Sequence, residues 1–370
     1  MKRSIVRLCA VGDVCLADSA YCIGHGTRSA ITRGGMERFS ALLAAGLSPA
    51  DLRVANLEAV HSRLGARPYR LSTLEMRGDS DHLDLMRAAQ FDVVNLANNH
   101  IFQHGRAPYD DLLEQLRVRS IQVVGHDDGP GATRVVTLER GGVPFHFVGF
   151  SLRPEQYHPD QTVPYSLRRT EREVLDEVRE MARGRRGHVI CSLHWGHEYV
   201  ETPSREQQSL ARALVDAGVS LILGHHPHVL QGIEQYSRGL IAYSLGNFVF
   251  DLREPETLDT AALYVDFDAD GIRGFDLEPL RIGPEFFPER PPDDRALQLR
   301  TRMAELANGL RVAVPPPAAE LLPIESARSR ASSYFAYRHF ATNLFRYNPL
   351  LAFQSVFRAV LRRLGLAHNP

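Results

Sequence analysis

Residues 219–228 read VSLILGHHPH, a short apolar run that ends in a glycine followed by three histidines. A run of this length that closes on Gly is typical of a buried strand. Stretches with helical apolar spacing separate such runs, at 36–45, 80–90, 109–118, 169–182 and 204–217. The alternation of the two patterns predicts an α/β domain with a parallel sheet. The other candidate strands are 5–11, 52–55, 92–96, 121–124, 189–193 and 240–244.

Polar side chains follow six of these predicted strands, directly where each strand ends. In open α/β sheets, ligands bind beyond the carboxyl ends of the strands. One histidine at one strand end would mean little, but six polar strand ends from distant parts of the chain predict a common site. The residues are Asp13, then Asn56 and Glu58, then Asn98, Asn99 and His100, then His194, His197 and Glu198, then His225, His226 and His228, and finally Asn247.

The chemistry of these side chains points to a metal ion. Carboxylate, amide oxygen and imidazole suit divalent ions such as Mn, Fe, Zn, Mg or Ca. Taken singly, Asp13 could cap a helix and Glu58 could form a surface ion pair, whereas the His226-Pro227-His228 loop has few structural uses. The four cysteines show no zinc-type spacing, so we expect buried thiols and no structural zinc site.

Composition excludes several classes of protein. The chain has 370 residues, of which 44% are hydrophobic, with 43 basic against 44 acidic side chains. A net charge this close to zero gives no field that would draw the protein onto nucleic acid. No apolar run approaches the roughly 20 residues of a membrane span, and Asp13 interrupts the run near the N-terminus. We therefore expect a cytoplasmic protein.

Changes in composition divide the chain into three parts. We expect a catalytic domain over residues 1–285, a Pro-rich linker with a helix over 286–325, and a basic, aromatic-rich helical extension over 326–370. Within the first part, hairpins are expected at 134–150 and at 262–280. The extension has no acidic residue, and we expect its aromatic face to pack on the main domain. The alternative is a surface for an acidic peptide, a partner or a membrane.

The same strings resemble the CapA (poly-γ-glutamate capsule synthesis) family of the calcineurin-like metallophosphoesterase superfamily. The resemblance runs from about residue 5 to residue 282 and rests on AVGD (10–13), NLE (56–58), NLANNH (95–100), HWGHEY (194–199), GHHPHVLQ (224–231) and SLGNFVFD (244–251). It implies a four-layer α/β sandwich with the metal site at the strand ends, to which the composition of residues 326–370 adds a C-terminal helical extension. By motif, the implied metal ligands are Asp13, Glu58, Asn99, His194, His226 and His228, with His100 as the acid/base histidine.

Two departures from the superfamily pattern bear on the reaction. The usual Asp-x-His is Asp13-Val14-Cys15 here, and Gln103-His104 follows His100 where an Asp is common. Both changes weaken the expectation of two-metal phosphoester hydrolysis.

The sequence leaves several reactions open for a peptide or poly-amino-acid carboxylate substrate. The favoured hypothesis is epimerisation at the Cα of a C-terminal residue, since a divalent ion beside a carboxylate stabilises the charge formed when the α-proton leaves. Two bases on opposite faces would exchange the proton, and His100, His197 and Asp251 are the candidates. The alternatives are two-metal phosphoester hydrolysis, and poly-γ-glutamate or capsule biosynthesis, which includes γ-glutamyl amide hydrolysis. A catalytically silent binding protein is the remaining possibility.

Overall fold

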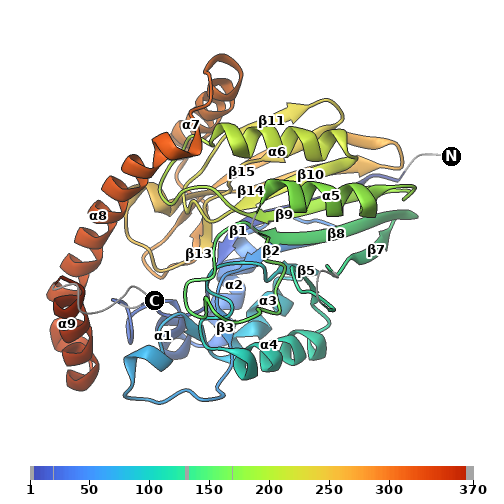
Figure 1. Ribbon diagram of the computed structural model, residues 1–370. Helices are drawn as coiled ribbons and strands as arrows, with labels where there is room; N and C mark the ends of the chain where they lie inside the picture. The colour runs from blue at the N-terminus through green and yellow to red at the C-terminus, as the bar shows by residue number, and fades with distance from the viewer. Residues whose placement is uncertain (1–3, 20, 130–132, 169, 364–370) are drawn as a thin grey trace.

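The computed structural model describes residues 4–19, 21–129, 133–168 and 170–363. Two β-sheets pack face to face, and helices cover the outer face of each (Figure 1). The molecule therefore has the four-layer α/β sandwich that the family resemblance implied.

The first sheet has eight strands in the order β16-β15-β14-β1-β2-β5-β6, with β13 also paired to β1. β1, β2, β5, β6 and β13 run parallel, and β14 to β16 continue the sheet antiparallel. The hairpin expected at 262–280 is confirmed as β14 and β15. The strands are β1 (Val6–Val14), β2 (Leu52–Leu57), β5 (Val93–Asn95), β6 (Gln122–Val124), β13 (Asn247–Val249), β14 (Asp259–Asp268), β15 (Gly271–Ile282) and β16 (Pro288–Glu289).

The second sheet has six strands in the order β11-β12-β10-β9-β8-β7. Its central strands β8, β9, β10 and β12 are parallel, and the hairpin expected at 134–150 is confirmed as β7 and β8. The strands are β7 (Val136–Arg140), β8 (Val143–Ser151), β9 (His188–His194), β10 (Val219–His225), β11 (Ile233–Tyr236) and β12 (Gly239–Ala242). A separate pair is formed by β3 (Val60–His61) and β4 (Arg77–Gly78).

Alternation along the strands builds two apolar layers at once. In β1, Leu8 and Ala10 face the second sheet, while Cys9 and Val11 face the helices. Successive side chains of a strand point to opposite faces, so a strand that is buried on both faces reads as a continuous apolar run. This explains why the apolar runs of the sequence mark the strands so clearly.

Helices cover both outer faces of the sandwich. α1 (Thr27–Gly34), α2 (Met36–Gly46), α3 (Leu83–Ala88) and α4 (Arg106–Val118) pack on the first sheet, and α5 (Glu171–Ala182) and α6 (Arg205–Asp216) pack on the second. The helix expected at 80–90 is a 3₁₀ turn, η2 (Ser80–His82), followed by α3. Capping boxes at Thr170 and Ser204 start α5 and α6; the expected helix start at Arg169 lies outside the described residues. The other 3₁₀ turns are η1 (Leu71–Thr73), η3 (Pro255–Leu258) and η4 (Leu344–Arg346).

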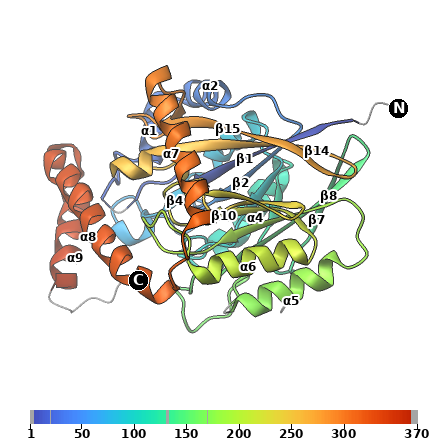
Figure 2. The same ribbon diagram turned by 90° about the horizontal axis from the view of Figure 1, so that it is seen from above.

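Three further helices follow the sheets: α7 (Asp293–Val312), α8 (Ala318–Thr342) and α9 (Pro349–Arg363). α7 packs on the sandwich through Met303, whereas α8 and α9 lie along the end of the molecule away from the N-terminus (Figures 1 and 2). The expected packing of aromatic residues on the main domain holds for Phe340 and Tyr347, which are buried beside Tyr21. No helix among the described residues is long and apolar enough to cross a membrane.

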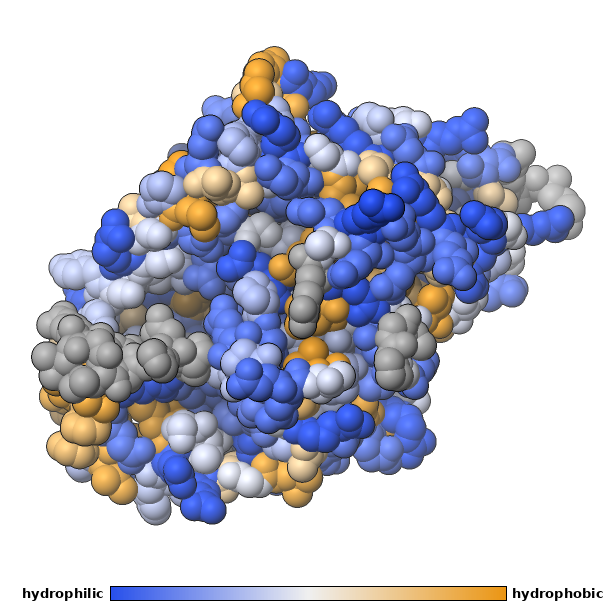
Figure 3. Space-filling model, viewed as in Figure 1, coloured by the Kyte–Doolittle hydropathy of each residue, from blue (hydrophilic) through white to orange (hydrophobic). Residues whose placement is uncertain are grey.

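The same expectation is wrong for part of the C-terminal extension. Phe345, Phe353 and Phe357 are 80%, 65% and 53% exposed, and Figure 3 shows hydrophobic side chains gathered over α9. α9 contacts the domain through Leu351, on the helix face opposite Phe353 and Phe357, and this face packs on η1.

Candidate metal centre

The strand ends converge on one cluster of carboxylate and imidazole groups. Asp13 is in β1, and Glu58 follows β2 directly. His194 ends β9 and lies in register with His225, the last residue of β10. The loop after β10 adopts positive φ at His226 (97°) and His228 (58°), which turns two histidines toward the same point. Neighbouring parallel strands thus deliver side chains from both sheets to one place.

Glu58 lies at the middle of this cluster. Its Oε1 is 3.9 Å from His194 Nε2 and 3.6 Å from His228 Nε2. Two overlapping groups share it, one with His226 and His228 and one with Asp13 and His194, and in each group the potential ligand atoms lie within 4.8 Å of one another. All five residues are buried. The spacing is that of a cation site with Glu58 common to both halves.

Asn99 completes the set expected from the sequence. Its Oδ1 is 2.8 Å from His194 Nε2, and the residue is 2% exposed. The structure therefore brings together all six residues that the motifs indicated as ligands, and their role as ligands stays a prediction.

Unpartnered polar atoms show that this donor set fits a cation. Both carboxylate oxygens of Glu58, both ring nitrogens of His226 and Nδ1 of His194 are buried without a hydrogen-bond partner among the described residues. A buried carboxylate without hydrogen bonds is costly, and a divalent ion would compensate that cost. Oxygen and imidazole donors together suit a divalent transition ion or a harder cation.

Burial and mutual repulsion perturb the carboxylates of the cluster. Burial raises the pKa of Glu58 well above its ordinary value, and the charge of Asp13 adds to that effect. Burial alone would also raise the pKa of Asp13, yet the histidines around it, first His225, hold it below its ordinary value. Two carboxylates this close are difficult to ionise together unless positive charge lies between them.

Residues behind the cluster orient its members. Asn56 Nδ2 donates to Asp13 Oδ1 over 2.9 Å, and the backbone N–H of His226 donates to Asp13 Oδ2 over 3.1 Å. Asn247 Oδ1 lies 2.8 Å from His228 Nδ1 and so leaves Nε2 facing Glu58. Such outer contacts fix the orientation of a metal-binding imidazole. The sequence placed Asn56 and Asn247 at strand ends without assigning them this role.

His100, expected to act in acid–base catalysis, lies beside Asn99 at the edge of the cluster. Its Nδ1 is 3.3 Å from Gln103 Oε1 and 3.2 Å from the hydroxyl of Tyr157. Burial lowers the pKa of His100 to about 4. The ring is therefore neutral near pH 7 and is held by uncharged partners.

The other two expected catalytic residues have partners elsewhere. His197 Nδ1 is 2.7 Å from Glu325 Oε2, a carboxylate of α8. Asp251 Oδ2 accepts a hydrogen bond from the backbone N–H of Ser19, and burial, with the charge of Asp18 adding to it, raises the pKa of Asp251. Among the described residues, no hydrogen bond or ion pair joins His197 or Asp251 to the six clustered side chains. Their catalytic roles stay predictions.

The sequence reasoning missed Arg153 and Glu325. Arg153 Nη1 donates to Gly196 O over 2.8 Å, and its Nη2 is 3.8 Å from Glu325 Oε1. The positive charge of Arg153 lies near enough to His226 to interact with it electrostatically. Glu325 also accepts from the backbone N–H of Glu198 over 3.1 Å. Arg153 follows β8 as other site residues follow their strands, which is a usable signal. No local signal in the sequence connects residue 325 with the turn at 196–198.

Comparison with known proteins agrees with the motifs. Residues 7–252 match the model of the family described as "Bacterial capsule synthesis protein PGA_cap". The chain is 31% identical over 223 residues to the capsule biosynthesis protein CapA of Bacillus anthracis, covering 56% of this chain and 52% of that protein. It is 30% identical over 212 residues to the PGA biosynthesis protein CapA of Bacillus subtilis, covering 56% of each.

This chain thus spans about half the length of these curated relatives. Among solved structures, a putative 5′-nucleotidase from Staphylococcus aureus superposes with a TM-score of 0.47 at 15% identity, covering 82% of this chain and 58% of that one. The family model covers about two thirds of the residues, and the motifs it spans carry the clustered side chains. The chain belongs to the bacterial capsule synthesis protein PGA_cap family.

Proposed function

We propose that this protein is a divalent-metal-dependent hydrolase that cleaves an amide bond in a carboxylate-bearing peptide or poly-amino acid, with a γ-glutamyl chain as the best candidate. The observation that carries the proposal is Glu58, a fully buried carboxylate whose Oε1 faces both His194 and His228 and whose two oxygens make no hydrogen bond among the described residues. The substrate class is supported by the names of the relatives, which refer to capsule and PGA biosynthesis.

The proposed ion is held by the six clustered residues: Asp13, Glu58, Asn99, His194, His226 and His228. When bound, it supplies a Lewis acid and lowers the pKa of a water molecule. His100 follows Asn99 in the chain and lies near enough to interact with His228, so its ring can relay a proton to the leaving nitrogen. Tyr157 and Gln103 hold that ring in place.

Arg153 is the proposed contact for a substrate carboxylate. Its guanidinium is half-buried and its Nε has no partner among the described residues, while Nη1 donates to Gly196 O and Nη2 lies 3.8 Å from Glu325 Oε1. A substrate carboxylate would share this guanidinium with Glu325, and a charge-assisted hydrogen bond to it would position the neighbouring amide bond. Arg153 and His226 therefore define the direction from which a carboxylate-bearing chain would enter.

Hydrolysis agrees better with these contacts than epimerisation does. Epimerisation needs a base on each face of the Cα atom. His197 is engaged by Glu325, and Asp251 by the backbone of Ser19, so only His100 among the three candidates lies beside the cluster. One acid–base residue is sufficient to protonate a leaving amine.

The test combines a γ-linked glutamate oligomer, deuterium oxide and mass spectrometry. We expect Mn- or Zn-loaded protein to yield two fragments with the mass of one added water, and EDTA to abolish the cleavage. His100→Gln should lower turnover about 100-fold or more while metal content is retained. His158→Gln is the matched control and should retain activity, because His158 is a half-buried loop histidine that contacts Phe102 and none of the clustered residues.

Two outcomes would overturn the proposal. Uptake of one deuteron at Cα without cleavage would show epimerisation. Turnover of nitrophenyl phosphate, with no cleavage of any γ-glutamyl or α-peptide substrate, would show a phosphoesterase.

A further inference from the structure

We propose that a second site, separate from the metal centre, binds a small ligand carrying two or more oxyanion groups. The site is a cavity of about 610 Å³ between α1, the loops at 253 and 284–286, and the end of α8. We call it the cationic pocket, and its charged or titratable nitrogen-bearing side chains are His25, Arg33, Arg38, Arg253, His339 and Arg346. The inference does not depend on the proposed hydrolase activity.

The lining of the cationic pocket carries uncompensated positive charge. Its one carboxylate is Glu285, which lies 2.5 Å from Arg38 Nη2. Among the described residues, no carboxylate lies within 4.0 Å of the guanidinium groups of Arg33, Arg253 and Arg346. Three arginines that converge on one cavity repel one another, and an anion between them would relieve that repulsion.

Two buried carboxylates outside the lining act on the pocket electrostatically. The negative charge of Asp18 lies near enough to interact with His25, and that of Asp251 lies near enough to interact with Arg253. The oxygens of Asp18 accept hydrogen bonds from Ser29 and from a backbone N–H, so they are already engaged. These carboxylates moderate the positive potential of the cavity without neutralising the three arginines directly.

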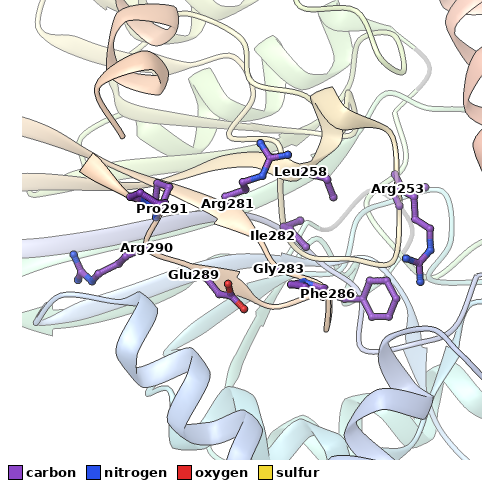
Figure 4. A pocket seen from close by; sticks show the side chains of 12 residues that line it. Arg253, Leu258, Arg281, Ile282, Gly283, Phe286, Glu289, Arg290 and Pro291 are labelled. Atoms are coloured by element: carbon purple, nitrogen blue, oxygen red, sulfur yellow. The ribbon is translucent and has the colours of Figure 1, made fainter. Parts of the chain in front are cut away.

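Two hydrogen-bond donors in the pocket lack partners. Nε of Arg253 and Nε2 of His339 are buried and make no hydrogen bond among the described residues. The guanidinium of Arg253 lies 4.6 Å from the centre of the Phe286 ring, and Figure 4 shows the two side chains next to each other. Stacking on an aromatic ring fixes the plane of a guanidinium and leaves its edge for a planar oxyanion.

One of the two histidines, His339, is suited to bind an anion as a neutral donor. Burial, followed by the charge of Arg253, lowers the pKa of His339 to about 4. The amide of Asn343 donates to His339 Nδ1 over 3.1 Å, so the single N–H of the neutral ring is on Nε2. Burial is also the main cause that lowers the pKa of His25, but a hydrogen bond with the backbone of Arg346 opposes this shift and engages the ring.

A short segment separates the cationic pocket from the metal centre. The ring of Phe250 packs 4.9 Å from that of His228, and Arg253 is three residues further along the chain. Three residues extend at most about 11 Å. The pocket is therefore close to the metal centre but is built from other side chains, and the two sites can be tested separately.

Calorimetric titration of the intact, metal-free protein tests the inference. The probes are N-acetylated triglutamate, whose charged groups are all carboxylates, and pyrophosphate, whose charged groups are all phosphates. N-acetylated triglutamine amide is the uncharged control. We expect one binding site for at least one probe, and the probe that binds identifies the class of anion. Arg346→Gln and Arg33→Gln should each weaken binding about tenfold, the effect of losing one charge-assisted hydrogen bond.

Matched variants separate a built site from general charge attraction. Arg330→Gln and Arg338→Gln remove the same charge from the exposed part of α8, outside the pocket lining, and should leave the affinity within about twofold. His226→Ala, in the metal centre, should also leave it unchanged. Absence of binding for both probes, equal losses in the Arg338 and Arg346 variants, or loss in the His226 variant would overturn the inference.

Discussion

Replacing Glu58 by Gln is the sharpest test of the metal centre, because the expected effects on the metal-free and metal-loaded protein have opposite signs. Without metal, burial and the charge of Asp13 make the Glu58 carboxylate unfavourable. The amide of Gln is neutral and can donate to Asp13. We therefore expect Glu58→Gln to stabilise the metal-free protein by about 1–3 kcal/mol, the usual cost of a buried polar group without partners.

With metal present, the effect reverses. Wild-type protein at a metal concentration 100 times its Kd gains about 2.7 kcal/mol, while a variant that lacks the shared carboxylate should gain little at the same concentration. The assay is urea unfolding followed by circular dichroism, with and without Mn or Zn, after dialysis against EDTA. Glu180→Gln, an exposed position on α5, is the control and should behave like wild type in both conditions.

The reasoning fails if Glu58→Gln destabilises the metal-free protein and still gains the full metal-dependent stabilisation. That result would make Glu58 a structural residue whose partners lie outside the cluster. A different result would be that Glu58→Gln stabilises the metal-free protein while metal does not stabilise wild type. That result would support the electrostatic cost of the buried carboxylate and would contradict the metal site.

Three further changes test the surroundings of the site. Burial and a neighbouring carboxylate raise the pKa of Asp251 to about 7. A carboxyl group whose pKa is raised by folding makes the free energy of unfolding fall as pH rises from about 4 to 7. Asp251→Asn should therefore remove about 2 kcal/mol of the difference between the free energies of unfolding in urea at pH 5 and pH 8. At Gly12 a Cβ atom would overlap the carbonyl oxygen of Gly246, so Gly12→Ala should push β13 away from β1 and cost about 1–3 kcal/mol. It should also lower metal affinity when Mn or Zn is titrated calorimetrically into the EDTA-dialysed protein. Glu325→Gln weakens the contact to His197 and should speed hydrogen exchange in residues 318–342 while costing about 1 kcal/mol; unchanged exchange there would contradict the role assigned to α8.

The central cluster could be predicted from the sequence because parallel strands place their carboxyl ends along one edge. Asp13, Glu58 and His194 each follow or end an apolar run, and that position alone indicates a shared site. The positions of His226 and His228 could be predicted because both lie in the loop that directly follows a buried strand. Periodicity and the identity of the side chains were sufficient at these positions.

Contacts between sheets could not be predicted in the same way. The chain leaves β12 in the second sheet and returns through β13 to the first, where Asn247 lies in register with Asp13. Residues 240–247 show an apolar run and a glycine in the sequence. This pattern does not indicate that the chain passes from one sheet to the other. Asn247 was therefore expected near the site, while its contact with His228 depends on a crossover that only the fold reveals.

The contacts of the C-terminal extension were harder to predict from the sequence. Its aromatic and basic composition predicted that it packs on the main domain, but not that its helix contacts two sites. Glu325 near the start of α8 holds the turn around His197, while His339 near its end lines the cationic pocket. The two residues are fourteen positions apart along the helix, which corresponds to about 21 Å. A ligand in the pocket would order the end of α8, and a rigid helix transmits that order to Glu325. An anion that binds there should therefore slow hydrogen exchange at both ends of residues 318–342, whereas local ordering would slow it at the C-terminal end alone.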